Sequence, residues 1–372
     1  MRLQSLAIVA TALALLASCA SPSARAPASG GSGAAPAPAA AAPAAAAPAA
    51  AAAPAQAAPA PAGPLRSLKM AYGFVSTTDI PMWVAQDQGI FAKYGLDVDT
   101  TLLQTSAQIA PAMAAGEVDV ALTAGAGVVD IDLAGGNQVL IEAEQNMMRF
   151  FLHAQPEIRR VEDLRGKRVA ITRLGSGIHL ATFKVLEQAG LDPGRDTAII
   201  QAGTVNNALS ALASDQVEAA MLSAPTNILA ERQGFPLLVD LKDFHIPYSQ
   251  GALAVTRTTL EERYDLVRDF VKAMLEARGV AMRDPALAKR LLGQNTKTED
   301  QEILDRSYQL WLEDLDELPY PSTDAVQTVL DQRAPEVAAA RTANPRDFVD
   351  DRIIRELDQS GFLRTALNVP SR

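Results

Sequence analysis

Four short runs of small and polar residues interrupt the apolar segments of the chain, and each leads into a helix-like pattern. The candidate binding residues in these runs are Ser76, Thr77, Thr123, Gly125, Ser176, Gly177 and Thr226. Hydroxyl groups exchange hydrogen bonds with polar ligands, glycine lets the backbone approach closely, and N–H groups at a helix start attract anions. These residue types predict non-covalent binding of a small molecule.

Helix caps and tight turns explain any one of these runs more simply, because they use the same residues. Four runs that each follow a predicted strand favour a binding site, since ligands of open α/β sheets bind beyond the carboxyl ends of the strands. Three aromatic residues are candidate walls of that site: Phe74, Trp83 and Tyr248. Trp83 suits the core equally well. Arg173 is the one arginine expected near the site, which leaves the charge of the ligand open.

Catalytic and metal-binding constellations are hard to assemble from this sequence. The three histidines, His153, His179 and His245, have neither His-x-x-x-His spacing nor a neighbouring cysteine, so we expect no zinc site. Gly-x-Ser-x-Gly and Gly-x-x-x-x-Gly-Lys-Ser/Thr motifs are absent. The run 175–177 has Leu180 where a dinucleotide-binding fingerprint needs its third glycine. We therefore expect no enzyme activity and no cofactor.

Strand and helix patterns alternate in two blocks of the sequence. The first block, residues 68–122, predicts strand, helix, strand, helix and strand, and the second block restarts this rhythm after Pro156. Such alternation predicts the α/β class, with largely parallel sheets covered by helices. Apolar segments near 150–157 and 250–257 predict two crossings between the blocks, which together would form a hinge. The rest of the chain is predicted to be helical and to cover the first block.

The first 66 residues differ from the rest of the 372-residue chain. Residues 1–19 have a basic start, an apolar run and small residues leading to Cys19, the only cysteine, so we expect a lipoprotein signal peptide. An ordinary signal peptide with a cysteine at its cleavage site is the alternative. Residues 20–66 are rich in Ala and Pro and predict a disordered linker.

Acidic residues outnumber basic ones, 43 to 33, giving a formal net charge of −10. The first 66 residues contain no acidic residue, so the remainder is more acidic still. This balance argues against nucleic acid as a partner, because nucleic-acid binding needs a basic surface. An anionic small molecule stays possible, since local donors can outweigh a distant net charge.

Several motifs resemble one family of transport proteins. They are WVAQDQGIFAKYGLDV at 83–98, AAGEVDVAL at 114–122, VEDLRGKRVAI at 161–171 and GSG at 175–177. In this order they are similar to the periplasmic substrate-binding proteins of ABC transporters, in the branch for nitrate, sulfonate, taurine and thiamine precursors. The likeness covers about residues 67–365. It implies a two-lobed periplasmic-binding-protein fold (type II, Venus flytrap) with two hinge crossings. Lobe 1 would comprise 67–153 and 255–372, and lobe 2 would comprise 154–254.

The resemblance also implies location and partners. The protein would be extracytoplasmic, in the periplasm or at the cell surface, and anchored to the membrane by a lipid on Cys19. It would be a monomer that binds a small-molecule solute and presents it to an ABC permease. The family's binding residues lie mainly in the loops of Ser76, Thr123 and Ser176.

The motifs do not name the solute. A small anion of the sulfonate, nitrate or taurine type is the first expectation, and an aromatic or heterocyclic solute such as a pyrimidine or flavin-like vitamin precursor is the second. A thiamine-pyrimidine biosynthetic enzyme is a rival, although such relatives use a reactive histidine and a cysteine-rich segment, and no cysteine follows Cys19. A scaffold lipoprotein that has lost its ligand is a further alternative.

Overall fold

The computed structural model describes residues 63–103 and 106–368, which contain two five-stranded sheets. The first sheet has the strand order β2-β1-β3-β10-β4 and the second has the order β7-β6-β8-β5-β9. The first sheet consists of β1 (Arg66–Tyr72), β2 (Leu96–Leu102), β3 (Val120–Thr123), β4 (Gln138–Met147) and β10 (Pro247–Thr256). The second consists of β5 (Phe151–Ala154), β6 (Arg168–Ile171), β7 (Ala198–Gln201), β8 (Ala219–Leu222) and β9 (Leu237–Asp240).

Both sheets are mixed rather than purely parallel. In the first sheet β1 pairs in parallel with β2 and β3, whereas β10 pairs antiparallel with β3 and β4. Because Ala252 lies opposite Thr123, the residues of β10 that precede Ala252 extend beyond the carboxyl end of β3. In the second sheet β6 pairs in parallel with β7 and β8, and β5 pairs antiparallel with β8 and β9. The carboxyl ends of β1 and β3 thus share one sheet edge with the start of β10.

The chain passes from the first sheet to the second at 148–150 and returns at 241–246. These crossings lie a few residues before the predicted ones, because β5 already pairs in the second sheet and β10 pairs in the first from Pro247 onward. The Gln250 side chain joins β10 to the first crossing, since it accepts a hydrogen bond from the Arg149 N–H (3.0 Å) and donates one to the Arg149 carbonyl oxygen (3.2 Å). The lobe boundaries themselves stay a prediction.

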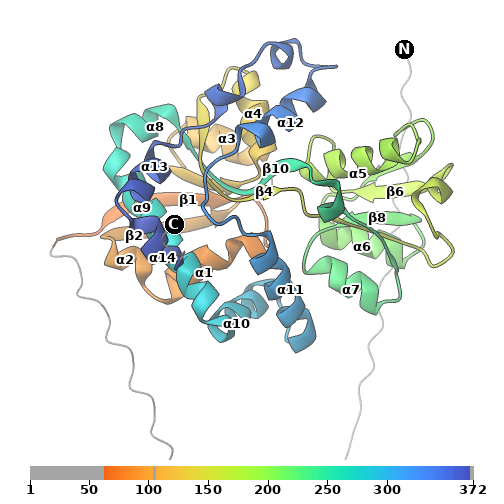
Figure 1. Cartoon of the computed structure of the whole chain (residues 1–372), viewed down its shortest axis with the longest axis horizontal. Coiled ribbons are helices and arrows are strands. Elements are labelled where there is room, and N and C mark those ends of the chain that lie inside the picture. The colour runs from red at the N-terminus through yellow and green to blue at the C-terminus, as the bar shows by residue number, and fades with distance from the viewer. Residues whose placement is uncertain (1–62, 104–105, 369–372) are drawn as a thin grey trace, which may run out of the picture. The chain divides into compact units, whose positions relative to one another are not determined.

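Fourteen α-helices of the described residues accompany the two sheets (Figure 1). The helices of the first half of the chain are α1 (Ile80–Asp87), α2 (Ile90–Lys93), α3 (Ser106–Ala114), α4 (Gly125–Leu133), α5 (Gly177–Gln188), α6 (Val205–Ala213) and α7 (Thr226–Arg232). Those that follow β10 are α8 (Arg257–Glu262), α9 (Tyr264–Arg283), α10 (Pro285–Thr296), α11 (Gln301–Asp314), α12 (Thr323–Arg333), α13 (Arg352–Gln359) and α14 (Phe362–Leu367).

The first sheet is covered on both faces, as its apolar alternation requires. On one face Leu68, Met70 and Leu253 pack with α1, α9 and α13, and the rings of Phe91 and Phe270 stack with centroids 5.6 Å apart. Part of the other face belongs to a core that includes α4 and α12 and continues to α5 on the second sheet. Burying apolar surface on two faces is what stabilises such a sheet.

Sequence analysis predicted most of these elements but not their full extent. The helix expected after Asp284 begins at Pro285, and Asp284 caps it by accepting a hydrogen bond from the Leu287 N–H (3.0 Å). The single last helix expected over 348–363 is instead two helices, α13 and α14, because Gly361 between them adopts a left-handed conformation (φ 76°). Helix α12 falls in the part of the chain that was predicted to be helical, but no helix with these bounds was predicted.

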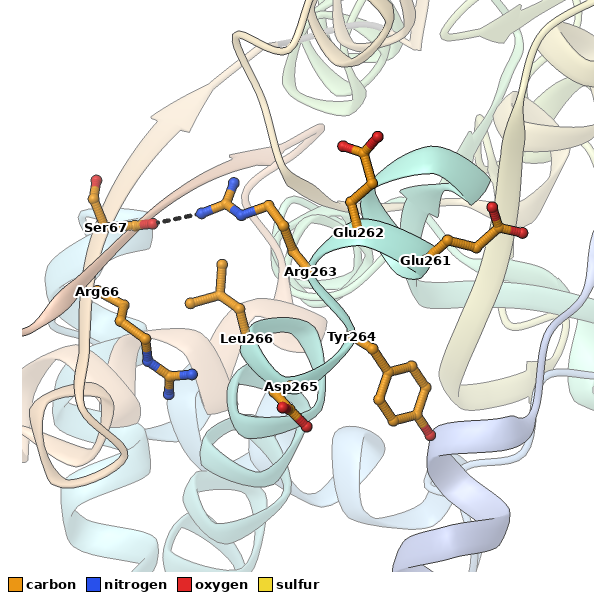
Figure 2. Close-up of a pocket in the computed structure, with 8 residues that line it drawn as sticks. All are labelled: Arg66, Ser67, Glu261, Glu262, Arg263, Tyr264, Asp265 and Leu266. Atoms are coloured by element: carbon orange, nitrogen blue, oxygen red, sulfur yellow. Dashed lines mark hydrogen bonds between the residues drawn. The ribbon is translucent and has the colours of Figure 1, made fainter.

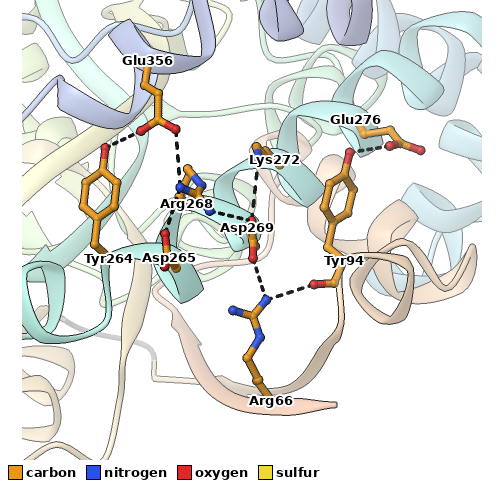
Figure 3. A network of polar contacts seen from close by, with 9 residues as sticks. All are labelled: Arg66, Tyr94, Tyr264, Asp265, Arg268, Asp269, Lys272, Glu276 and Glu356. Carbon is orange, nitrogen blue, oxygen red and sulfur yellow. Dashed lines mark hydrogen bonds and ion pairs between the residues drawn. The ribbon is translucent and has the colours of Figure 1, made fainter. Parts of the chain in front are cut away.

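A polar network holds the first strand against α9 (Figure 3). Arg66 pairs with Asp269 (2.6 Å) and donates a hydrogen bond to the carbonyl oxygen of Tyr94 (3.2 Å). Asp269 also lies near Arg268 and Lys272, at 3.7 and 3.8 Å. The residues are partly exposed, so each pair contributes little by itself. Together they fix where β1 begins relative to the longest helix.

Helix α9 meets α14 at Gly279. A Cβ atom at this position would lie 1.8 Å from the carbonyl oxygen of Ala366, which is a backbone atom that cannot move aside alone. We expect Gly279→Ala to lower the free energy of unfolding by about 2 kcal/mol or more through overpacking. Denaturant unfolding measures this, and the sign is informative because alanine normally stabilises a helix interior relative to glycine. Gly63→Ala is the control, since a Cβ atom there meets nothing within 4 Å. Equal stability of Gly279→Ala and wild type would contradict the packing.

Candidate functional site

The first residues of β10 touch three of the four predicted loops. A Cβ atom at Gly177 would lie 2.5 Å from the Tyr248 hydroxyl oxygen, and one at Gly125 would lie 3.0 Å from the Ser249 Cβ. A Cβ atom at Gly251 would lie 2.9 Å from the Thr78 side chain. Glycine is needed at these three places because the backbones approach side chains so closely. The segment 248–251 therefore gathers the starts of α4, α5 and the 3₁₀ helix η1 (Thr77–Asp79).

The loop after β1 is held by a capping box. Ser76 Oγ accepts a hydrogen bond from the Thr78 N–H (3.3 Å), and the Asp79 carboxylate accepts one from the Ser76 N–H (2.7 Å). Thr77, Thr78 and Asp79 are buried, whereas Val75, just before them, is 38% exposed. The first loop thus presents an apolar side chain beside a rigid polar turn.

Helix α5 begins with a similar cap. Ser176 Oγ accepts a hydrogen bond from the His179 N–H (3.1 Å) and donates one to the Arg173 carbonyl oxygen (2.7 Å). Its hydroxyl is therefore already used by the fold. Leu174, two residues before Ser176, is 58% exposed.

Thr226, in the fourth predicted loop, is the first residue of α7. Thr226 Oγ1 donates a hydrogen bond to Asn206 Oδ1 (3.2 Å), which joins the starts of α7 and α6. Helix α11 contacts both α7 and η1, and its Arg306 pairs with Glu231 of α7 (2.7 Å). Arg232 of α7 pairs in turn with Asp300, the residue that caps α11. Helix α7 is thereby tied to α11 by its last two residues, Glu231 and Arg232.

The aromatic candidates lie in different surroundings. Tyr248 is buried against Gly177 between the two sheets, and Phe74 is half-buried at the end of β1. Trp83 is 4% exposed and packs in the core beside α9, so the structure does not bring it to the loops. Cys19 lies outside the described residues.

One arginine of the site was missed by sequence analysis. Arg333, at the end of α12, binds both carboxylate oxygens of Asp130 on α4 (2.6 and 2.9 Å) and donates a hydrogen bond to the Gly175 carbonyl oxygen (2.7 Å). It therefore joins the first sheet's α4 to the turn that precedes α5. A signal for α12 was present in Ser322, a helix cap, followed by apolar Val326, Val329 and Leu330 at helical spacing. Arg173, the arginine expected near the site, is half-buried in the same turn.

Three carboxyl groups are buried, one on η1 and two on β4. Asp79, Glu142 and Glu144 are 0%, 6% and 5% exposed, and the Cγ of Glu144 would be 3.4 Å from a Cβ atom at Gly251. Burial raises the pKa of Asp79 and of Glu142 well above the ordinary range, and it raises the pKa of Glu144 to about 7. Arg278 is the nearby guanidinium that opposes the shifts of both glutamates. We call these three buried residues, Asp79, Glu142 and Glu144, the acidic floor of the site.

Two surface hollows lie away from these loops. The first has a volume of about 620 Å³ and is lined by residues at the start of β1 and at the junction of α8 and α9. Figure 2 shows its charged lining, in which Arg263 donates a hydrogen bond to the Ser67 carbonyl oxygen (2.9 Å). The second, of about 660 Å³, lies between α10 and α11. The first hollow is at the amino end of β1, opposite the edge where the loops converge.

Two further properties concern the described part of the chain alone. Within residues 63–103 and 106–368, no three His, Cys, Asp or Glu side chains gather as a metal site would require. No helix in these ranges has the length and apolar character needed to span a bilayer.

Comparison with known proteins gives the family. A sequence model of the family described as NMT1/THI5 like matches residues 76–288, which contain all four loops. The chain belongs to the NMT1/THI5-like family. This confirms the resemblance found in the sequence motifs, and one curated relative is named as a putative ABC transporter periplasmic binding protein.

Two curated relatives are each 25% identical to this NMT1/THI5-like protein. One is a putative ABC transporter periplasmic binding protein of Brachyspira hyodysenteriae, matched over 229 residues, and the other is the putative binding protein YtlA of Bacillus subtilis, matched over 220. Each match covers 57% of this chain and 65% of the relative, slightly less than two thirds of its length.

Solved structures confirm the fold. The periplasmic aliphatic sulphonate binding protein SsuA of Escherichia coli superposes with a TM-score of 0.63 at 18% identity, covering 77% of this chain and 92% of that one. The periplasmic nitrate-binding protein NrtA of Synechocystis PCC 6803 gives 0.67 at 16% identity, covering 82% and 90%. The α/β periplasmic-binding-protein fold expected from the sequence is therefore confirmed.

The acidic floor predicts an unusual dependence of stability on pH. Because the pKa of Glu144 is raised from 4.5 to about 7, the native state keeps a proton that the unfolded chain has lost. The free energy of unfolding should therefore fall as the pH rises from 4.5 to about 7. Glu144→Gln should remove part of this fall. At pH 8 the free energy of unfolding of this variant, measured with denaturant, should exceed that of wild type by about 2–3 kcal/mol.

The exposed substitution Glu117→Gln is the matched control and should leave the pH dependence unchanged. A wild-type protein as stable at pH 8 as at pH 5, or a Glu144→Gln profile parallel to that of wild type, would contradict the assignment.

Proposed function

We propose that this protein is the extracytoplasmic solute-binding component of an ABC importer, which captures a small molecule between its two sheets. The observation that carries the proposal is the convergence of three loops, those that open η1, α4 and α5, on segment 248–251 of β10. Ligands of open α/β sheets bind at such an edge. The names of the relatives support the same function.

The side chains at the loops favour an organic solute over a bare inorganic ion. Val75 and Leu174 are exposed beside the first and third loops, and Phe74 is half-buried at the end of β1. Binding sites for organic molecules are mainly apolar with a few well-placed polar groups. Arg333 supplies a cationic side chain next to the α5 start, although Asp130 already neutralises it. A sulfonate-like or heterocyclic organic solute is the class that suits these residues.

Capture would work by closure of the two sheets on the solute. Contacts from η1 and α4 on one side and from α5 and α7 on the other exist together only when the loops are close, so the solute stabilises that arrangement. The closed form would then be presented to a membrane permease. A lipid on Cys19, residues 20–66 as a spacer and a monomeric state complete the proposal.

Native mass spectrometry of protein purified without denaturation tests the function. A small molecule should leave the protein on mild activation, and adding it back to unfolded and refolded protein should raise the melting temperature. Conversion of that molecule to a product by the isolated protein would favour the enzyme. A protein that carries no small molecule and is stabilised by no extract fraction would leave the scaffold alternative in place of the receptor.

Closure predicts a role for the ion pair between Arg306 and Glu231. These side chains are 40% and 30% exposed, so the pair is worth about 1 kcal/mol or less. We expect Glu231→Gln to weaken binding of the recovered solute up to about fivefold by calorimetry. Asp305→Asn is the matched control, because it removes an ion pair of the same helix with Lys289 of α10, on the first-sheet side only. Equal weakening by both variants would contradict the closure mechanism.

A further inference from the structure

Two consecutive helices, α11 and α12, reach from the side of the first sheet to that of the second. Arg306 of α11 pairs with Glu231 of α7 (2.7 Å), and Arg333 of α12 donates a hydrogen bond to the carbonyl oxygen of Gly175, in the turn before α5 (2.7 Å). Figure 1 shows α11 and α12 on opposite sides of β4 and β10. The second-sheet side is thus held at two separate places.

Both helices pack on elements of the first sheet. Tyr308 of α11 donates a hydrogen bond to the carbonyl oxygen of Ala281 in α9 (3.0 Å), and Trp311 lies in the same core. Val326 and Val329 of α12 pack beside α4 and β10. The four side chains from α11 and α12 are buried. The two helices therefore belong to the first-sheet side, and their contacts with α7 and the turn before α5 join that side to the other.

The segment that connects the two helices, residues 315–322, is fastened to the edge strand β4. The Asp316 N–H donates a hydrogen bond to the Glu144 carbonyl oxygen (2.9 Å), and the Asn146 side chain donates one to the Asp316 carboxylate (2.8 Å). Asn146 Oδ1 also accepts a hydrogen bond from the Ser249 hydroxyl (3.0 Å). The two helices thus share one anchor, and this anchor is bonded to the start of β10, where the three loops converge.

The contact made by Arg333 is the stronger of the two. Its guanidinium also binds both carboxylate oxygens of Asp130, and the Arg333 side chain is only 12% exposed. A charged donor forms a hydrogen bond roughly twice as strong as a neutral donor does, and salt screens a buried charge much less than an exposed one. The side chains of Arg306 and Glu231 are 40% and 30% exposed, so water and salt weaken their attraction.

The Arg333 contact acts directly on a binding loop. Gly175 immediately precedes Ser176 and Gly177, the third predicted loop, and it lies on the second-sheet side. Separation of the two sheets must therefore break the hydrogen bond from Arg333 to Gly175, and it would leave the guanidinium paired with Asp130 alone.

We propose that α11, α12 and segment 315–322 form a clamp that holds the two sheets together before any solute binds, with Arg333 as its main fastening. The clamp is a property of the solute-free protein. Its effect on capture rests on the proposed function, because a solute would reach the loops only in the share of molecules in which the clamp is open. The clamp would therefore regulate how readily the site is filled and emptied.

Distance measurement between two spin labels tests the clamp without solute. The labels are attached through Thr101→Cys, near the end of β2, and Ser210→Cys, on α6, which are exposed positions on the two sides. The full chain carries Cys19→Ser, so that only the introduced cysteines react, and it is unfolded and refolded to remove small molecules. We expect one predominant distance, which corresponds to the separation of residues 101 and 210 in the structure.

Loss of the fastening should populate a second, longer distance. Arg333→Gln should raise the ratio of open to closed molecules about tenfold, and Glu231→Gln should raise it about fivefold or less. The double variant should raise it by the product of the two factors, because the two contacts share no residue.

Arg257→Gln is the matched control. Arg257 also binds both carboxylate oxygens of an α4 residue, Asp132 (3.0 and 2.9 Å), and donates a hydrogen bond to a backbone carbonyl oxygen, that of Asp347, but these residues all lie on the first-sheet side. This variant should keep the wild-type distance. If Arg333→Gln lowers the melting temperature by more than a few degrees, Asp130→Asn weakens the same fastening at a partly exposed residue and should populate the longer distance to a smaller extent.

The inference is overturned if the solute-free protein shows only the longer distance, or if folded Arg333→Gln and Asp130→Asn variants keep the wild-type distance. It is also overturned if Arg257→Gln populates the longer distance as much as Arg333→Gln does. Those outcomes leave the receptor function intact when native mass spectrometry still finds a bound small molecule. Absence of any bound molecule in that experiment counts against the receptor function, and the clamp stands if the distances respond as expected.

Discussion

The contact of one short segment with three helix starts determines how the rest of the molecule is arranged. Residues 248–251 open the strand that returns to the first sheet, and they lie against Gly177, Gly125 and Thr78. Side chains larger than hydrogen at the two glycines would push these backbones apart. Because β10 is antiparallel to β3, its first residues extend past the strand tips. Convergence of the loops therefore follows from the direction of a single strand.

The same strand couples the loops to the hinge. Gln250 bonds both backbone groups of Arg149 at the other crossing, and Arg149 pairs with Asp240 (3.1 Å) and Asp314 (2.7 Å) at the ends of β9 and α11. The side chain of Arg149 is 8% exposed, so its charge is stable only with these partners in place. Both crossings thus form one connected unit, and motion of one sheet relative to the other must pass through it.

Local pattern and tertiary contact explain what the sequence could and could not predict. The strands of both sheets and most of the helices around them were predictable, because their apolar periodicity indicates which residues are buried. The loops were predictable as a set, since each follows a strand. The role of Arg333 was not, because it depends on α12 meeting a turn 158 residues earlier in the chain. The acidic floor was equally hidden, because glutamates in a strand are normally exposed, and the burial of Glu144 depends on distant helices that bring Trp311 and Arg278 beside it.

The distribution of tryptophan gives this protein an internal optical probe. The chain has two tryptophans, and Trp83 is fixed in the core near α9. Trp311 is fully buried on α11, and its indole N–H points at Glu144 Oε1 at 3.4 Å. An indole excited state is sensitive to the charge of a carboxyl at its N–H. Emission from Trp311 will thus report on the protonation of the floor beneath the first loop without any attached dye.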